Sequence, residues 1–363
     1  MKKNKNYVDL KDQPVPEGQH LLEVDDLKMY FHTEDGVVRA VDGVSYTLDR
    51  GETLGVVGES GSGKSVTAMT IMGLISMPPG KIEGGDVRYR GRSILEMTEE
   101  EMQHIRGNDI AMIFQDPMTS LNPVYKIGKQ VGEGLRLHRG YSKQEALKRA
   151  TELLDLVGIP EPEKRVNEYP HQFSGGMRQR VMIAMALACD PDILIADEPT
   201  TALDVTIQAQ IIELMQEMQE KNGNAIIMIT HDLGVVADMA DKIMVMYAGR
   251  PVEFGTAEEI FYESRHPYTW GLIRSIPEQA IEEKKPLTPI HGNPPSLMNL
   301  PEGCVFSPRC SYATDKCRKQ RPERVVTESG HYSACHYSGD PEFLKNAPET
   351  SRTRKDSKKG GEA

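Results

Sequence analysis

A glycine-rich segment near residue 60 has the residue types and the spacing of a phosphate-binding loop. Residues 58–65 read GESGSGKS and match the pattern Gly-x4-Gly-Lys-Ser in full. In such a loop the glycines let N–H groups face the phosphates, the lysine reaches the β- and γ-phosphates, and the serine hydroxyl binds Mg²⁺. An apolar strand before the loop and a helix after it argue against an ordinary surface loop. The candidate nucleotide-binding residues are Gly58, Glu59, Ser60, Gly61, Ser62, Gly63, Lys64, Ser65 and Val66.

Two carboxylates at the end of an apolar run could complete the chemistry of a nucleoside triphosphatase. The segment ILIADE covers residues 193–198 and ends in Asp197 and Glu198. Asp197 would hold the magnesium shell, and Glu198 would orient or deprotonate the attacking water. An acidic pair after a strand is more often a solvated turn, but the complete phosphate loop favours the catalytic interpretation. Lys64 and Glu198 are therefore candidate catalytic residues.

A second segment also has the features of an anion site. Residues 173–177 read FSGGM and precede an apolar, helix-like run. Ser174, Gly175 and Gly176 would expose backbone N–H groups at the start of that helix, where anions bind favourably. An ordinary helix cap is the alternative. The chain thus has two predicted phosphate sites about a hundred residues apart.

Four of the five cysteines are close together in the C-terminal part of the sequence. Cys304, Cys310, Cys317 and Cys335 are separated by 5, 6 and 17 residues. Four thiols in a chain without a secretory signal suggest a soft metal site, either zinc or iron–sulfur. Their spacing matches neither the common zinc pattern nor the common ferredoxin patterns, so both metals and unliganded thiols remain open. His331 and His336 beside the last cysteine are interpreted as exposed bystanders, and the fifth cysteine as a core residue.

The elements that must position these residues alternate between short strands and helices. Residues 53–60, 192–199 and 225–232 contain buried apolar runs, and a helix with apolar residues on one face lies between the last two. The stretch 95–190 is mostly helical, with a capping box at Ser142 and Glu145. Residues 242–255 indicate two strands around an Ala-Gly turn. This order predicts an α/β fold with a helical subdomain and a small cysteine-bearing C-terminal extension.

The domain boundaries follow from composition. We expect a flexible N-terminal arm at 1–20, a nucleoside triphosphatase domain at 21–258, a C-terminal domain at 259–345 and a disordered tail at 346–363. A net charge of −11 argues against binding to nucleic acid. No apolar run reaches the ~18–20 residues that span a bilayer, and no secretory signal is recognisable, so we expect a cytosolic chain.

Five motifs in order along the chain resemble those of the ATP-binding cassette (ABC) ATPases. The segment FSGGM resembles their signature Leu-Ser-Gly-Gly-Gln. Gln115 in IFQDP is similar to the Q-loop glutamine that contacts Mg²⁺, residues 201–204 (TALD) to the D-loop, and His231 to the switch histidine that senses the γ-phosphate. The resemblance implies ATP as substrate and Mg²⁺ held by Ser65, Gln115 and Asp197. It also implies an aromatic residue on adenine, for which Phe31 is favoured over Tyr30.

The same resemblance explains the two phosphate sites. In this family two subunits pack head to tail, and each ATP lies between one phosphate loop and the other subunit's signature. Ser174, Gly175, Gly176 and Met177 would therefore contact the nucleotide of a second ATPase subunit. Phe173 replaces the usual leucine and keeps an apolar anchor. Met177 replaces glutamine, which makes this signature atypical and favours a heterodimer.

Three longer segments are similar to the ATPase subunits of oligopeptide and dipeptide importers. They are residues 115–123, 169–211 and 230–255, and the similarity extends from about 22 to 340. Residues 265–277 are similar to the C-terminal region of the same subunits. It implies a peripheral protein on the cytoplasmic face of the cell membrane, two permease subunits and an extracellular peptide-binding protein. It also implies a [4Fe–4S] cluster on the four clustered cysteines. A soluble non-transport ABC ATPase and an importer of nickel or another small solute are the alternatives.

Overall fold

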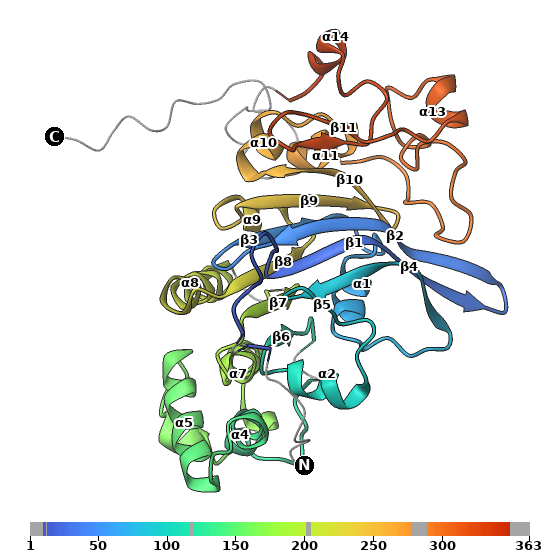
Figure 1. Ribbon diagram of the computed structural model, residues 1–363. Coiled ribbons are helices and arrows are strands. Elements are labelled where there is room, and N and C mark those ends of the chain that lie inside the picture. Colours follow the sequence, from blue (N-terminus) through green and yellow to red (C-terminus); the bar gives the residue numbers. More distant parts are fainter. Residues whose placement is uncertain (1–9, 12, 117–119, 201–204, 277–288, 349–363) are drawn as a thin grey trace.

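The protein is described by a computed structural model in which residues 10–11, 13–116, 120–200, 205–276 and 289–348 are described. Two sheets form its centre (Figure 1). The antiparallel sheet has the strand order β2 (Gly36–Leu48), β1 (Leu22–Thr33), β4 (Gly80–Tyr89), β5 (Arg92–Ser93). The larger sheet has the order β11 (Val325–Val326), β12 (Tyr332–Ser333), β10 (Arg250–Thr256), β9 (Lys242–Tyr247), β3 (Thr53–Val57), β8 (Ala225–Thr230), β7 (Ile193–Asp197), β6 (Ile110–Ile113).

The central strands of the larger sheet are parallel and buried on both faces. Strands β9, β3, β8, β7 and β6 pair in parallel, and all residues of β3, β7 and β8 are buried. Val56 packs into one apolar core and Val57 into the other, which explains why these segments are continuously apolar in sequence. The three predicted strands are thus confirmed. Because the strands are parallel, their carboxyl ends meet at one edge, where a ligand can bind.

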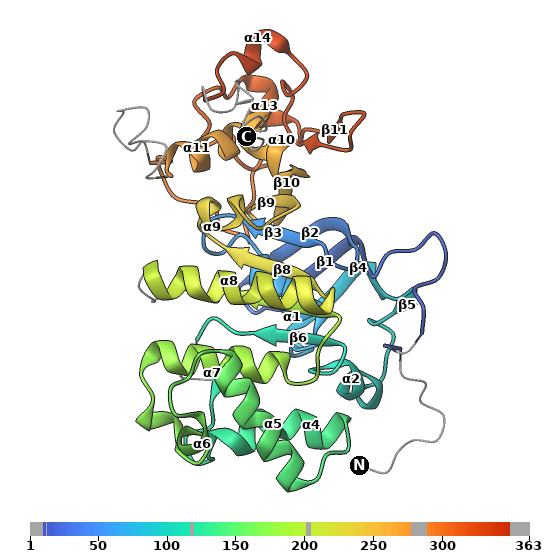
Figure 2. The same ribbon diagram turned by 90° about the vertical axis from the view of Figure 1, so that its left-hand side faces the viewer.

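The helical part of the chain lies below this sheet in Figures 1 and 2. It contains α4 (Ile127–His138), α5 (Lys143–Leu156), α6 (Pro162–Arg165), the 3₁₀ turn η1 (Pro170–Gln172) and α7 (Gly175–Leu187). The predicted capping box is present, because the Ser142 hydroxyl accepts from the Glu145 N–H at 3.3 Å and the Glu145 carboxylate accepts from the Ser142 N–H at 2.8 Å. The expected helical stretch 95–190 also contains α2 (Glu99–Ile105) and strand β6 of the large sheet, so it is not wholly helical.

The remaining elements of the ATPase part cover and close the large sheet. Helix α1 (Lys64–Ile71) follows β3, and α8 (Val205–Asn222) runs across the sheet face seen in Figure 2. Ile211, Leu214 and Met218 on α8 are buried, as the spacing predicts. Short helix α9 (Leu233–Ala237) follows β8. The predicted turn between β9 and β10 is present at Ala248 and Gly249, whose φ angles are 48° and 80°.

The C-terminal extension lies at the opposite end of the molecule from the helical part (Figures 1 and 2). It contains α10 (Ala257–Tyr262), α11 (Pro267–Arg274), α13 (Asp315–Lys319) and α14 (Pro341–Leu344), and its strands β12 and β11 extend the large sheet beyond β10. Trp270 on α11 is fully buried, donates to the Ser264 carbonyl at 2.9 Å and packs against Tyr312 and Phe343. The extension therefore shares a sheet with the ATPase part.

Two chain ends were expected to be loose. At the N-terminal end Leu10 is buried, and the Lys11 ammonium donates to backbone carbonyls of Asn108 and Cys189 at 3.2 and 3.0 Å. Residues 10 and 11, in the middle of the predicted flexible arm, are therefore packed against the domain, because an apolar and a charged side chain both find partners there. Residues 349–363 of the predicted disordered tail lie outside the described residues. Within the described residues, no helix is both long and apolar enough to span a bilayer.

Candidate nucleotide-binding site

The phosphate loop connects β3 to α1 and depends on glycine at two positions. Gly58 and Gly63 have φ angles of 154° and 100°. A Cβ atom would lie 2.2 Å from the Met246 carbonyl oxygen at Gly58, and 2.3 Å from the Ala40 carbonyl oxygen at Gly63. Both positions therefore exclude any side chain, because the loop passes directly over neighbouring backbone.

Lys64 lies inside the curl of this loop. Its ammonium donates to the carbonyl oxygens of Gly58 and Glu59 at 2.7 and 3.1 Å. Burial lowers the pKa of Lys64, while the nearby carboxylates of Glu198 and Asp197 act in the opposite direction. The loop thus holds a cation where the motif predicts one.

Ser65 and Asp197 meet at the carboxyl edge of the sheet. The Ser65 hydroxyl at the start of α1 donates to the Asp197 carboxylate at the end of β7, at 2.9 Å. Asp197 is 5% exposed, and burial raises the pKa of its carboxyl group. A hydroxyl and a carboxylate side by side are oxygen donors of the kind that Mg²⁺ prefers, so these residues fit the expected ion.

Glu198 is at the centre of a second set of contacts. Gln115 follows β6 and donates its amide N–H to the Glu198 carboxylate at 3.0 Å. His231 follows β8, and its Nδ1 lies 3.4 Å from the same carboxylate oxygen. The Glu198 backbone N–H donates to the Ile229 carbonyl at 2.8 Å, which fixes this residue to β8. Three predicted residues from three adjacent strands are therefore brought together.

The signature segment begins helix α7. The Ser174 hydroxyl caps this helix by accepting from the Met177 N–H at 3.3 Å, and Gly175 and Gly176 form its first turn. Phe173 is 3% exposed, as expected for an apolar anchor. The Met177 side chain packs against the apolar core. The D-loop predicted at 201–204 lies outside the described residues.

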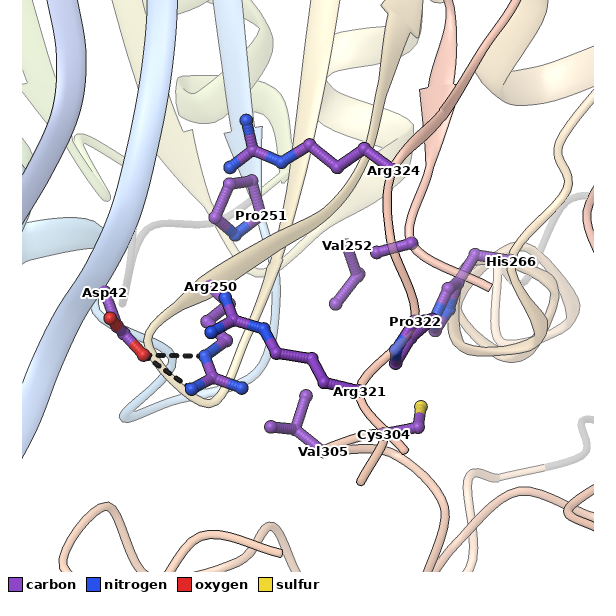
Figure 3. Close-up of a pocket in the computed structure, with 11 residues that line it drawn as sticks. Asp42, Arg250, Pro251, Val252, His266, Cys304, Val305, Arg321, Pro322 and Arg324 are labelled. Carbon is purple, nitrogen blue, oxygen red and sulfur yellow. Dashed lines mark hydrogen bonds and ion pairs between the residues drawn. The ribbon is translucent and has the colours of Figure 1, made fainter. Parts of the chain in front are cut away.

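The two candidates for the adenine contact differ in their partners. The Tyr30 hydroxyl donates to the Asp42 carboxylate at 2.9 Å, and burial together with this bond raises the pKa of Tyr30 to about 12. Asp42 also pairs with Arg250 at 2.6 Å, at the side of a small hollow between the ATPase part and the extension (Figure 3). Phe31 is partly buried against the core of the antiparallel sheet, and its side chain, unlike that of Tyr30, has no polar group that bonds to a neighbour.

The four clustered cysteines line one cavity in the extension. Cys304, Cys310, Cys317 and Cys335 line this small cavity together with aromatic side chains. Burial raises the pKa of Cys310 to about 11 and that of Cys335 to about 12. Among the described residues, no group of three or more His, Cys, Asp or Glu side chains is arranged to hold a metal ion. The convergence of the four thiols on one pocket is thus observed, but the expected metal site is not confirmed.

The two histidines beside the last cysteine have separate roles. His331 is 1% exposed, and its Nε2 lies 3.1 Å from the buried Glu253 carboxylate. The interpretation of His331 as an exposed bystander is therefore wrong, since it belongs to a buried pair that joins the extension to β10. His336 lies 2.9 Å from the Gln320 carbonyl oxygen through its Nε2.

Sequence reasoning missed two residues that contact the phosphate loop. Arg309 of the extension donates through both terminal nitrogens to the Glu59 carboxylate, at 2.5 and 3.0 Å. The Glu59 N–H donates to the Tyr268 hydroxyl at 2.9 Å. Glu59, which was predicted to belong to the nucleotide site, thus also contacts the extension through its N–H and its carboxylate. No motif indicated this, because the partners are about 210 and 250 residues away in sequence.

These features define the class of protein as a P-loop ATPase of the ATP-binding cassette type. Residues 41–201 match the family described as "ABC transporter", and residues 252–317 match "Oligopeptide/dipeptide transporter, C-terminal region". In the solved dimeric structure of the ATP-binding cassette MJ0796 with ADP and Pi, the matched chain has a TM-score of 0.59 and 29% identity, and the match covers 65% of this chain and 98% of that one.

Curated relatives match over most of their length. The chain is 58% identical to the oligopeptide transport ATP-binding protein OppD of Bacillus subtilis over 86% of this chain and 87% of that protein. It is 52% identical to the dipeptide transport ATP-binding protein DppD of Escherichia coli over 88% and 97% of the two chains. The chain therefore belongs to the family of ATP-binding proteins of oligopeptide and dipeptide ABC transporters. The expected class of fold and the expected ATPase activity are confirmed.

Proposed function

We propose that this chain hydrolyses ATP to power the import of oligopeptides or dipeptides through a membrane ABC transporter. The observation that carries the ATPase part is the meeting of Ser65 with Asp197, and of Gln115 and His231 with Glu198, at one edge of the sheet. The match of residues 252–317 to the peptide-transporter C-terminal region supports the peptide substrate.

Each residue of the site has a distinct part in this proposal. Lys64 and the loop N–H groups hold the phosphates, while Ser65, Gln115 and Asp197 supply oxygen ligands for Mg²⁺. The ion, when bound, neutralises charge on the phosphate oxygens. Glu198 accepts a proton from the attacking water, and His231 senses the γ-phosphate. The 3.4 Å between His231 Nδ1 and the Glu198 carboxylate supports a joint role of the two residues. Phe31 stacks on adenine.

The assembly follows from the second phosphate site. Ser174, Gly175, Gly176 and Met177 contact the nucleotide of a second ATPase subunit, and that subunit's signature completes the site at Lys64. Two permease subunits form the pore and bind the ATPases at the cytoplasmic face of the membrane. An extracellular peptide-binding protein delivers the solute through these permeases, and nucleic acid has no part in the cycle.

The four thiols of the extension are the proposed ligands of a [4Fe–4S] cluster. Their common cavity and their donor type support this assignment over a disulfide framework. Anaerobically prepared protein should be brown, with broad absorption and about four irons per chain. Colourless protein with stoichiometric zinc would replace the cluster by a zinc staple. Metal-free protein with four readily alkylated thiols would exclude both.

Two substitutions test the ATPase assignment by separating binding from chemistry. Lys64→Ala removes a cation from the phosphates and should weaken ATP binding at least about tenfold. Glu198→Gln keeps the phosphate cradle, so ATP should bind while turnover falls about a hundredfold or more. Binding and single-turnover hydrolysis measured on both variants check this. Equal turnover in Glu198→Gln and the wild type would refute the role of Glu198.

The peptide assignment is tested separately from the ATPase assignment. The chain should copurify with permease subunits from detergent-solubilised membranes, and the reconstituted assembly should hydrolyse ATP faster when peptide-loaded binding protein is added. Stimulation by a nickel-loaded or other small-solute binding protein, with none by peptide, would contradict the substrate class.

A further inference from the structure

Glu59 has three polar groups, which are its carbonyl oxygen, its N–H and its carboxylate, and each of them has a hydrogen-bond partner in the structure. Its carbonyl oxygen accepts from the Lys64 ammonium at 3.1 Å, inside the phosphate loop. Its N–H donates to the Tyr268 hydroxyl on α11, and its carboxylate is held by the Arg309 guanidinium. Glu59 is therefore held on one side by Lys64, which reaches the phosphates, and on the other side by the extension.

Arg309 is built into the extension rather than attached to its surface. Its side chain is 4% exposed, and it also donates to the carbonyl oxygens of Ile290 and His291 at 3.1 and 2.9 Å. The ion pair with Glu59 raises the pKa of Arg309 further above its ordinary range. The Arg309 side chain of this bidentate pair is buried, whereas the Glu59 side chain is 30% exposed. Removal of Glu59 alone would leave the buried guanidinium without its carboxylate, which is costly.

The contact between the Tyr268 hydroxyl and the Glu59 N–H is also supported by packing of the Tyr268 ring. Tyr268 packs against Tyr247 at the end of β9 and against Phe306, with ring centroids 4.6 and 5.3 Å apart. Phe306 lines the cavity of the four cysteines, and Arg309 directly precedes Cys310. Packed aromatic side chains and one ion pair therefore join that cavity to the phosphate loop.

We infer that Arg309 and Tyr268 are positioning residues for the nucleotide, and that through them the C-terminal extension sets the affinity of the phosphate loop. The inference rests on the proposed ATPase function and extends it to the control of one site by another part of the chain. A free carboxylate on a phosphate-binding loop repels a polyphosphate, and Arg309 both neutralises the Glu59 carboxylate and holds it at the extension. Removing Arg309 should therefore weaken nucleotide binding through Glu59.

The test measures equilibrium binding of a nonhydrolysable ATP analogue with Mg²⁺ to the full chain. Arg309→Gln should bind about tenfold more weakly than the wild type, which corresponds to about 1.4 kcal/mol. Glu59→Gln should bind at least as tightly as the wild type, because the repelling charge is absent. The double variant Arg309→Gln/Glu59→Gln should recover to within about threefold of the wild type, since the two effects are coupled through one contact.

Arg318→Gln is the matched control. Arg318 lies in the same extension, but its side chain is 59% exposed, and within the described part of the chain it pairs with Asp315 on its own helix. Affinity should therefore stay unchanged. The double variant also leaves no unpaired buried ion, so it remains informative if Arg309→Gln does not fold. Failure of Glu59→Gln to restore affinity, or wild-type affinity in a folded Arg309→Gln, would overturn the inference.

One further variant separates this inference from the proposed function. If Lys64→Ala binds the analogue as tightly as the wild type, the phosphate loop is not the nucleotide site and the proposed function fails. If Lys64→Ala loses binding and Arg309→Gln does not, only the positioning role of the extension fails.

Discussion

At the residue scale, Asp197 shows how a proposed magnesium ligand can lower the stability of the unliganded fold. Its carboxylate is 5% exposed and has the Ser65 hydroxyl as a hydrogen-bond donor, yet burial raises its pKa above the ordinary value of 3.8. A carboxyl group whose pKa is raised on folding destabilises the folded state once it is ionised. A bound cation would reverse this balance. The Asp197 carboxylate is therefore expected to stabilise the cation-bound state and to destabilise the unliganded fold.

Replacing Asp197 by Asn should make this cost visible. The amide keeps an acceptor for Ser65 but carries no charge, so the free energy of unfolding of unliganded protein should rise by about 1 kcal/mol at pH 7. Turnover should fall by about a hundredfold or more, because a metal ligand is weakened. Denaturation with urea between pH 3.5 and 7 provides the measurement.

The pH dependence supplies the control for this variant. The ionised fraction of Asp197 decreases as the pH falls through the raised folded-state value toward 3.8. The gain in the free energy of unfolding that Asp197→Asn produces should therefore be present at neutral pH and disappear in acid. A gain in the free energy of unfolding that is constant between pH 3.5 and 7 would contradict burial of the Asp197 charge as its cause.

The sequence predicts the residues of the nucleotide site better than their surroundings. Ser65, Asp197, Glu198 and His231 follow from motif spacing because parallel strands bring their carboxyl ends to one edge. The Arg309–Glu59 pair could not be predicted, because a single arginine among many forms no pattern with a partner so distant in sequence. Tyr30 and Phe31 are separable only in the structure, where one hydroxyl is seen to be engaged.

At the scale of elements, strand β6 shows where a pattern is too short to be informative. Residues 110–113 read IAMI and lie between two helices, so four apolar residues there are compatible with either state. They form a strand because they pair in parallel with β7. Tertiary pairing, rather than local preference, decides this element.

Strand β10 and the extension are joined by a pair whose removal should be costly. Glu253 is fully buried and accepts from the Arg265 and His266 N–H groups at 2.5 and 3.3 Å, in addition to its contact with His331. Glu253→Ala leaves these groups buried without an acceptor and should lower the free energy of unfolding by about 3 kcal/mol. Chemical denaturation followed by circular dichroism measures this.

An exposed pair of the same extension is the comparison. Glu342 on α14 pairs with Lys345, but its side chain is 78% exposed, so Glu342→Ala should change stability by less than about 0.5 kcal/mol. Similar losses for Glu253→Ala and Glu342→Ala would show that burial of the Glu253 pair does not govern its contribution.

At the scale of the whole molecule, the proposed head-to-tail assembly gives one chain half of each of two phosphate sites. The signature at α7 belongs to the helical part, while the phosphate loop lies between β3 and α1. The isolated chain should therefore hydrolyse ATP slowly, and addition of the second ATPase subunit of its transporter should accelerate turnover at least about tenfold. Steady-state rates over a range of subunit ratios provide the measurement. Full peptide-coupled turnover with this chain as the only ATPase would contradict the heterodimer.

The burial of Trp270 gives the molecule an internal optical reporter. The chain has one tryptophan, and that residue lies in α11, two residues after the tyrosine that contacts the phosphate loop. Indole emission shifts to longer wavelength when the ring enters water, so the emission spectrum describes the extension alone. Opening of the extension during denaturation can thus be followed without labels, and a change in emission on addition of nucleotide would reveal a conformational signal that leaves the ATPase site and reaches α11.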